Sequence, residues 1–180
     1  MGMNLGALLW ALAEATLFFV VPDVWLTVVA VQHGIRKAMI ACGFAVAGAL
    51  LGGAVMYLWA SADPASARAA LDHVPGISPG MIDRASAALE AQGVLAMLFG
   101  AFAGVPYKIY AVGSPGAGVG LALFLATSVP ARLMRFLLLS GMAATFTGIF
   151  DGLLSKRVVL AIVIVLWVAF YAVYWALVGF

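Results

Sequence analysis

Residues 38–62 read AMIACGFAVAGALLGGAVMYLWASA, a run of 25 residues without a charged side chain. A helix needs about 20 apolar residues to cross the hydrocarbon core of a bilayer, so this run is long enough to span it. A second charge-free run covers 158–180. A third region is long enough only if it carries Arg132 and Arg135 within the membrane. We therefore predict transmembrane helices over 38–60, 118–147 and 158–179.

The composition of the chain is that of a membrane protein. Of its 180 residues, 66% are hydrophobic and 9% are charged, and the mean hydropathy is +1.17. A soluble domain has roughly 45–50% apolar and about 25% charged residues. The formal net charge of +2 excludes a protein that binds nucleic acid through a strongly basic face. The single cysteine, Cys42, excludes an internal disulfide, and we expect it to pack among its apolar neighbours.

Two further apolar regions are interrupted too early to form one continuous span. Glu14 and the pair Pro22–Asp23 divide the region 5–32, and the segment Pro106-Tyr107-Lys108 lies near the middle of 93–116. We predict that each region is a re-entrant hairpin of two half-helices, with tips at Pro22 and at Pro106 and Tyr107. Non-helical backbone at membrane depth requires protein or a watery cavity to satisfy its polar groups, so these tips are candidate sites.

The positions of the charged residues predict an orientation. Lys and Arg tend to stay on the cytoplasmic side, and the pairs Arg36–Lys37 and Lys156–Arg157 share that side if both hairpins are re-entrant. The segment 61–92 carries four acidic residues against two arginines, which suits the external face. Within it we expect two short amphipathic helices at the membrane surface, at 64–73 and 82–92, separated by Pro and Gly.

These elements predict an all-α polytopic membrane protein in which residues 1–180 form a single membrane domain. A hairpin followed by a span occurs twice with opposite orientation, and a final transmembrane helix follows. Inverted repeats with broken helices are a recurrent design of transporters. The repeat is one of hydropathy, without sequence identity between the halves. No Lys or Arg precedes Leu5, so we expect no cleaved signal peptide.

Five charged residues remain at predicted membrane depth, where charges are costly and usually face a cavity or one another. We predict that Glu14 and Asp23 couple protons and that Lys108, Arg132 and Arg135 bind a substrate phosphate. The two arginines are three residues apart, so they share one helix face, and their forked donors suit phosphate. The sequence leaves open that the carboxylates are interfacial caps, and that the arginines snorkel or only pair with the carboxylates.

Other motifs give weaker predictions. The glycine pairs spaced by four residues, such as Gly48 and Gly52, indicate close helix packing. His33 and His73 lie too far apart in the predicted topology to share a metal ion. We find no nucleotide-binding loop, nucleophile elbow or zinc motif. We therefore predict neither a cofactor nor a metal, and we do not expect an enzyme.

The second half of the chain resembles a known family. Residues 104–110 (GVPYKIY), then Phe124, Ser128 and residues 132–136 (RLMRF), look like the Pro-Tyr-Lys hairpin and the Arg-x-x-Arg-Phe helix of the YqaA-like branch of the DedA family. This family is also called the VTT or SNARE-associated domain family. The first hairpin, with Glu14, Pro22 and Asp23, is similar to the family's acidic hairpin, and 48–57 to its glycine-rich helix. The resemblance covers about residues 5–147.

The resemblance implies two facing re-entrant hairpins and movement of lipid across the bacterial cytoplasmic membrane. The substrate would be polyprenyl phosphate or a phospholipid, and transport would depend on the proton-motive force. Glu14 and Asp23 would be the acidic pair, and Lys108 would stand for an arginine of the second hairpin. The chain departs from longer members at Ala101, where a further arginine is expected, and Arg132 or Arg135 would substitute. The partners are then lipid, protons and a possible second copy of the chain.

Two other classes of function stay open at this stage. A non-transporting assembly factor would use its buried charges only as pairs that fix the fold. An intramembrane enzyme acting on a lipid phosphate would have the cations, but the sequence lacks a credible nucleophile or metal set. The sequence does not decide between proton-coupled transport and passive scrambling.

Overall fold

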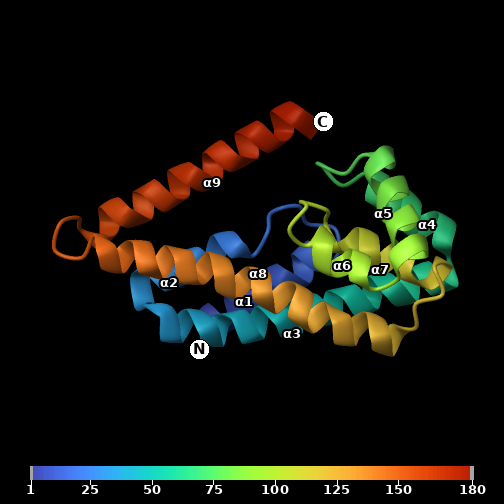
Figure 1. The fold of residues 1–180 in the computed structure, drawn as a ribbon, viewed down its shortest axis with the longest axis horizontal. Helices are drawn as coiled ribbons and strands as arrows, with labels where there is room; N and C mark the ends of the chain where they lie inside the picture. The colour runs from blue at the N-terminus through green and yellow to red at the C-terminus, as the bar shows by residue number, and fades with distance from the viewer. Residues whose placement is uncertain (1, 179–180) are drawn as a thin grey trace.

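The computed structural model describes residues 2–178, and within that range its regular elements are all helices, without strands (Figure 1). Its elements are α1 (Gly2–Ala15), α2 (Asp23–His33), α3 (Ile35–Ala62), α4 (Pro64–Asp72), α5 (Pro79–Gln92), α6 (Leu95–Gly100), α7 (Tyr107–Gly116), α8 (Leu121–Ile149) and α9 (Lys156–Val178). The predicted all-α class is confirmed. Residue 179, the last of the predicted final span, lies outside the described residues.

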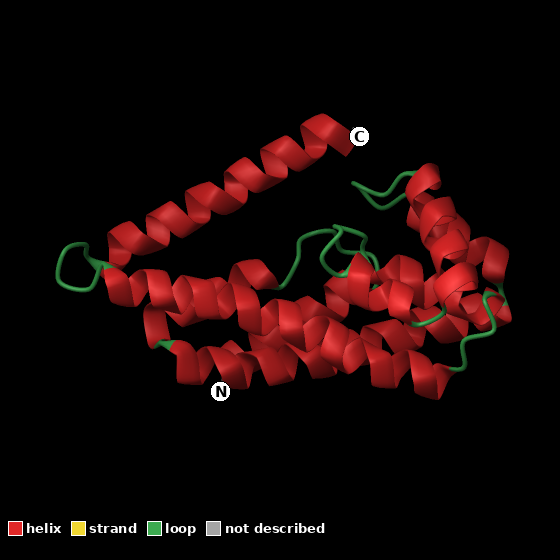
Figure 2. Cartoon of the chain, viewed as in Figure 1, coloured by secondary structure: helices red, strands yellow, loops and turns green. Residues whose placement is uncertain are grey.

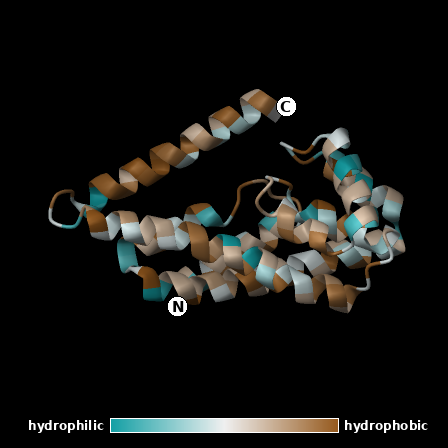
Figure 3. Cartoon of the chain, in the orientation of Figure 1, coloured by the Kyte–Doolittle hydropathy of each residue, from teal (hydrophilic) through white to brown (hydrophobic). Residues whose placement is uncertain are grey.

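Three helices, α3, α8 and α9, are long and apolar enough to cross a membrane, which makes the chain an integral membrane protein. They coincide with the three predicted spans. The helix bounds differ slightly from the predicted ones. The prediction used the limits of apolar runs, whereas a helix can include charged residues, as α3 does with Arg36 and Lys37 in its first turn. In the hydropathy view, α9 is apolar along most of its length, whereas polar residues gather on α4 and α5 (Figure 3).

Both interrupted regions contain two helices separated by a non-helical segment, as predicted (Figure 2). The first break covers 16–22 and the second 101–106. Pro22 and Pro106 are the residues that directly precede α2 and α7. Proline suits this position because it has no N–H to leave unsatisfied. Sequence reasoning placed Tyr107 in the second tip, but the structure makes it the first residue of α7, so only Pro106 lies in the turn.

The segment between α3 and α6 forms the two expected helices, α4 and α5. The side chain of Asp63 accepts a hydrogen bond from the Ser66 N–H at 3.0 Å, and Ser78 caps α5 in the same way through Met81 at 3.3 Å. With this cap and a proline at the first helical position, α5 begins at Pro79, three residues before its predicted start. The external location of this segment remains a prediction.

Small side chains allow α1 and α3 to pack closely. Ala7, Ala11 and Ala15 recur along one face of α1 and are fully buried. A Cβ atom on Gly48 would collide with the backbone of Leu8, and one on Gly52 with Leu12 and Ala15. The predicted packing role of this glycine pair is therefore confirmed.

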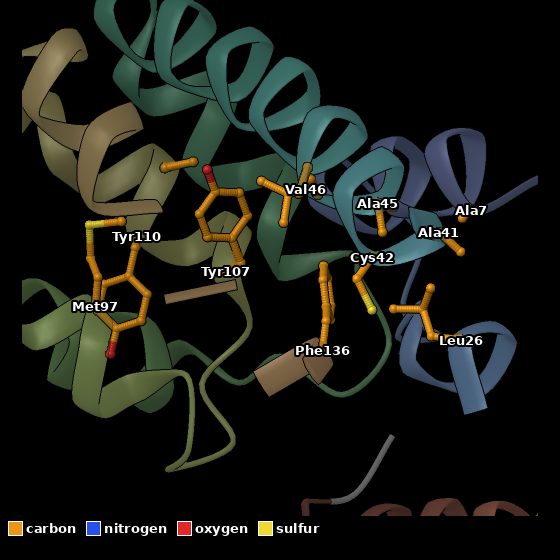
Figure 4. Packing of buried hydrophobic residues seen from close by; sticks show 14 of the residues in the cluster. Ala7, Leu26, Ala41, Cys42, Ala45, Val46, Met97, Tyr107, Tyr110 and Phe136 are labelled. Atoms are coloured by element: carbon orange, nitrogen blue, oxygen red, sulfur yellow. The ribbon is translucent and has the colours of Figure 1, made fainter. Parts of the chain in front are cut away.

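Cys42 lies in the core formed by α2, α3 and α8. Its side chain is fully buried, and Figure 4 shows it between Leu26 and Phe136. The prediction that it packs among apolar neighbours is confirmed.

Replacement of Gly48 by Ala should lower the thermal stability of the detergent-solubilised protein. The added methyl group forces α1 away from α3, and overpacking of this kind costs about 1–3 kcal/mol. Gly43→Ala, on the same helix with no atom within 4 Å of the added Cβ, should be neutral or slightly stabilising. Equal melting temperatures for the two variants would contradict the close packing.

Candidate functional site

The structure brings the five charged residues singled out from the sequence into one buried cluster. Glu14 is in the last turn of α1 and Asp23 opens α2, so the first break lies between them. Lys108 is in the first turn of α7, beside the second break. Arg132 and Arg135 come from the middle of α8. Four of the five residues are at most 3% exposed, and Arg135 is half-buried.

Each arginine pairs with one carboxylate. Arg132 donates a hydrogen bond through Nη2 to Glu14 Oε2. Arg135 donates through Nη2 to Asp23 Oδ2 at 2.5 Å. The two pairs fit together because the arginines share a face of α8 and the carboxylates flank one break. The two ion pairs join the second half of the chain to the first. Pairing of the arginines with the carboxylates was one of the alternatives that the sequence left open.

Lys108 has no carboxylate within 4 Å of its Nζ among the residues that the structure describes. Its Nζ instead donates a hydrogen bond of 2.7 Å to the carbonyl oxygen of Phe18. Phe18 lies in the first break, so this contact joins the two interrupted regions directly. In their ordinary ionised forms the five residues are three cations and two carboxylates, and Lys108 is the one of the three cations that forms no ion pair within the described residues.

A cavity of about 440 Å³ adjoins this cluster. Glu14, Lys108 and Arg135 line its charged part. Most of the remaining wall is apolar or aromatic and comes from both breaks, the turn between α4 and α5, and one face of α9. The cavity is therefore amphipathic, with three charged residues in a wall that is otherwise mostly apolar.

Three polar atoms of the cluster are buried and have no hydrogen-bond partner in the described part of the chain. They are Asp23 Oδ1, Arg132 Nε and Arg135 Nε. Buried donors and acceptors of this kind are uncommon, since an unsatisfied group loses its interaction with water. The ion pairs therefore do not exhaust the hydrogen-bonding capacity of the arginines.

The C-terminal helix α9 is attached to the cavity wall by a row of side chains that sequence reasoning missed. Trp167 donates to Thr27 Oγ1 at 3.0 Å, Tyr171 Oη accepts from the Val21 N–H at 2.8 Å, and Tyr174 donates to the Gly76 carbonyl at 2.6 Å. In Figure 1, α9 extends across the side of the other helices. The sequence could have indicated this row through the spacing of residues 167, 171 and 174, which puts them on one helix face.

No group of three or more His, Cys, Asp or Glu that would hold a metal ion occurs among residues 2–178. No protein-family model, curated protein or solved structure matches the chain. The family resemblance therefore stays a prediction based on the residues quoted above.

Removal of one partner of the Glu14–Arg132 pair should strongly destabilise the protein. Glu14→Leu leaves the Arg132 guanidinium buried without its carboxylate, which costs about 3–5 kcal/mol. The double variant Glu14→Leu/Arg132→Met removes both charges and should regain most of this loss. Denaturant unfolding in detergent measures the free energies.

The exposed pair between Arg68 and Asp83 is the matched control, with side chains 44% and 65% exposed. Arg68→Met should change the free energy of unfolding by less than about 1 kcal/mol. A double variant no more stable than Glu14→Leu would contradict the importance of the buried pair.

Loss of the Tyr171 hydroxyl should expose the backbone of the first break. Tyr171→Phe leaves the Val21 N–H without its acceptor, so amide exchange at Val21 should accelerate about 3- to 10-fold, the equivalent of one hydrogen bond. Hydrogen-exchange mass spectrometry of peptides covering 16–22 measures this. Tyr174→Phe, which alters the contact with Gly76 instead, should leave Val21 unchanged, and equal acceleration in both variants would refute a local effect.

Proposed function

We propose that the protein is a transporter that moves a phosphate-bearing lipid, a polyprenyl phosphate or a phospholipid, across the bilayer. The observation that carries this proposal is that Lys108, which forms no ion pair within the described residues, lines a cavity whose wall is mostly apolar and aromatic. An uncompensated buried charge is costly. An anionic ligand in the cavity would compensate it.

The chemistry of the cavity supports a lipid with an anionic headgroup. Lys108 offers a compact point charge, and Arg135 adds a forked guanidinium suited to phosphate oxygens. Apolar and aromatic side chains such as Phe102, Phe170 and Met81 line the remaining wall and suit a hydrocarbon chain. A free inorganic anion would leave this apolar surface unused, whereas an amphiphile uses both parts.

Proton coupling follows from the pairing of Arg132 with Glu14. Arg132 pairs with Glu14, which lines the cavity, but Arg132 is not itself among the lining residues. In the proposed cycle Arg132 turns from Glu14 to the lipid phosphate, and Glu14 loses its ion-pair partner. A protonated carboxyl group is less costly in such a place than an unpaired carboxylate. Binding of the anion and uptake of a proton would therefore occur together, and Asp23 would do the same beside Arg135. The proton-motive force would then drive the cycle.

The arrangement of the two breaks supports the transporter architecture. Both contribute to the wall of one cavity, and Lys108 bonds to the carbonyl of Phe18 across them. We propose that both interrupted regions are re-entrant hairpins that face each other, as in the DedA family that the sequence resembles. The protein would then reside in a bacterial cytoplasmic membrane.

A second candidate function has one observation in its favour. Both buried carboxylates already have an arginine partner, as an assembly factor with purely structural charges would require. This alternative gives Lys108 only the hydrogen bond to the Phe18 carbonyl as a task, and it predicts that lipid movement does not depend on the charge at position 108.

Replacement of Lys108 separates the two functions. In proteoliposomes, the wild-type protein should move fluorescent polyprenyl phosphate or phospholipid between leaflets, and Lys108→Met should reduce this rate at least about tenfold, since it removes the uncompensated charge. The same variant should melt at an equal or higher temperature, because functional sites are commonly built at a cost in stability.

Lys156→Met removes an exposed cation at the start of α9 and should leave transport unchanged. Absence of lipid movement by folded wild-type protein would refute the proposed transport. Full activity of Lys108→Met would favour the assembly factor.

A further inference from the structure

Aromatic rings from three helices form a continuous stack that ends on the arginines of the charge cluster. Tyr57 of α3 stacks on Phe124 of α8 at a centroid distance of 5.7 Å, and Phe124 stacks on Tyr107 of α7 at 5.6 Å. The guanidinium of Arg132 lies 4.9 Å from the Tyr107 centroid and 4.9 Å from that of Phe136. The Arg132 guanidinium is thus flanked by two rings.

The ring of Tyr107 is fixed from several directions. Its hydroxyl donates to Ser128 Oγ at 2.8 Å, and Ser128 in turn donates to the Phe124 carbonyl at 2.7 Å. The ring also lies directly against Gly53 of α3, where an added Cβ would overlap it. Phe136, the second ring in contact with the Arg132 guanidinium, is fully buried. Both rings therefore have fixed positions that do not depend on Glu14.

We propose that Tyr107 and Phe136 are positioning residues that hold the Arg132 guanidinium in place when its ion pair with Glu14 is broken. This inference rests on the proposed function, because a transport cycle requires Arg132 to exchange Glu14 for a lipid phosphate. An arginine held only by its carboxylate would lose its position at the moment when the anion must bind. Two ring faces attract the cation whatever the charge of Glu14.

The geometry of a guanidinium makes this arrangement compatible with anion binding. The N–H donors point outward in the plane of the group, whereas a ring stacked on it occupies the face. The rings therefore hold Arg132 without using its donors. Arg132 Nε, which has no hydrogen-bond partner among the described residues, remains able to bind a phosphate oxygen.

Phe136 also serves the second arginine. The guanidinium of Arg135 lies 5.9 Å from the Phe136 centroid. One ring thus borders both cations of α8, and the sequence Arg132-Leu133-Met134-Arg135-Phe136 places all three groups within little more than one turn.

The position of Arg132 can be tested without measuring transport. In ¹H–¹⁵N spectra of the full-length protein in nanodiscs, the Arg132 Hε resonance, assigned with Arg132→Lys, should be shifted upfield by the flanking rings. Phe136→Leu should reduce this shift, because it removes one of two rings at the same distance, and Tyr107→Phe, which keeps the ring, should retain it. Phe146→Leu is the matched control on α8, since Phe146 packs against Phe150 in a tilted arrangement, with the ring centroids 4.7 Å apart, beyond the cluster along the helix.

Glu14→Gln is the decisive variant. If the rings hold Arg132 independently of Glu14, the upfield shift persists in Glu14→Gln. If the Arg132 resonance moves to the position of an exposed arginine, the rings do not hold it and the inference is overturned. Where this variant is too unstable to purify, the same spectrum of the wild-type protein at a pH that protonates Glu14 gives the same two outcomes.

Transport provides a second, separate measurement. Phe136→Leu should raise the concentration of lipid phosphate for half-maximal transport about 10-fold and preserve most of the maximal rate, as expected for a residue that positions a binding group. Phe146→Leu should leave both values unchanged. If the wild-type protein moves no lipid but the Arg132 shift behaves as expected, the proposed function fails and the positioning by the rings stands. If lipid moves but Glu14→Gln releases Arg132, only the inference fails.

Discussion

The two ion pairs between α8 and the ends of α1 and α2 are the interaction on which the rest of the structure depends. Isolated charges are too costly to bury, so Arg132 and Arg135 bring Glu14 and Asp23, and with them the first break, against the middle of α8. The break itself exposes backbone groups that need partners. Three side chains are such partners. Lys108 donates a hydrogen bond to the Phe18 carbonyl, the Trp10 indole donates to the Val20 carbonyl, and the Tyr171 hydroxyl accepts from the Val21 N–H.

Charge and shape together set the proposed activity apart from a purely structural role. The pairs neutralise four of the five buried charges, and the fifth belongs to Lys108, beside a cavity that is otherwise apolar and aromatic. Folding alone requires from Lys108 only its hydrogen bond to the Phe18 carbonyl, which a neutral donor could also make. The surplus charge, the unpartnered donors of the arginines and the rings that flank Arg132 all favour exchange of one anion for another at this site.

Much of the fold follows from local sequence. An apolar run of about 20 residues is stable in a membrane only as a helix. The helices α3 and α9 could therefore be predicted from length and hydropathy, and α8 could be predicted once Arg132 and Arg135 were accepted within the span. Proline fixes the starts of α2, α4, α5 and α7 because it cannot donate the hydrogen bond that a helix interior needs. The five charged residues could be singled out for the same reason, as exceptions within apolar surroundings. Tyr107 was misplaced because a proline marks the start of a helix as readily as the tip of a turn.

The amino-acid sequence by itself thus determined that the chain is an all-helical integral membrane protein with two interrupted regions and a small set of buried charges. Only the tertiary structure decided which carboxylate faces which arginine, that Lys108 has no carboxylate partner among the described residues, and that α9 lines one side of the cavity with Phe170, Tyr171 and Tyr174. It also decided that Tyr57, Tyr107 and Phe124, which sequence places on separate helices, stack in line with Arg132. The physical reason is that hydropathy and helix propensity depend on neighbouring residues, whereas pairing and stacking depend on how distant helices pack.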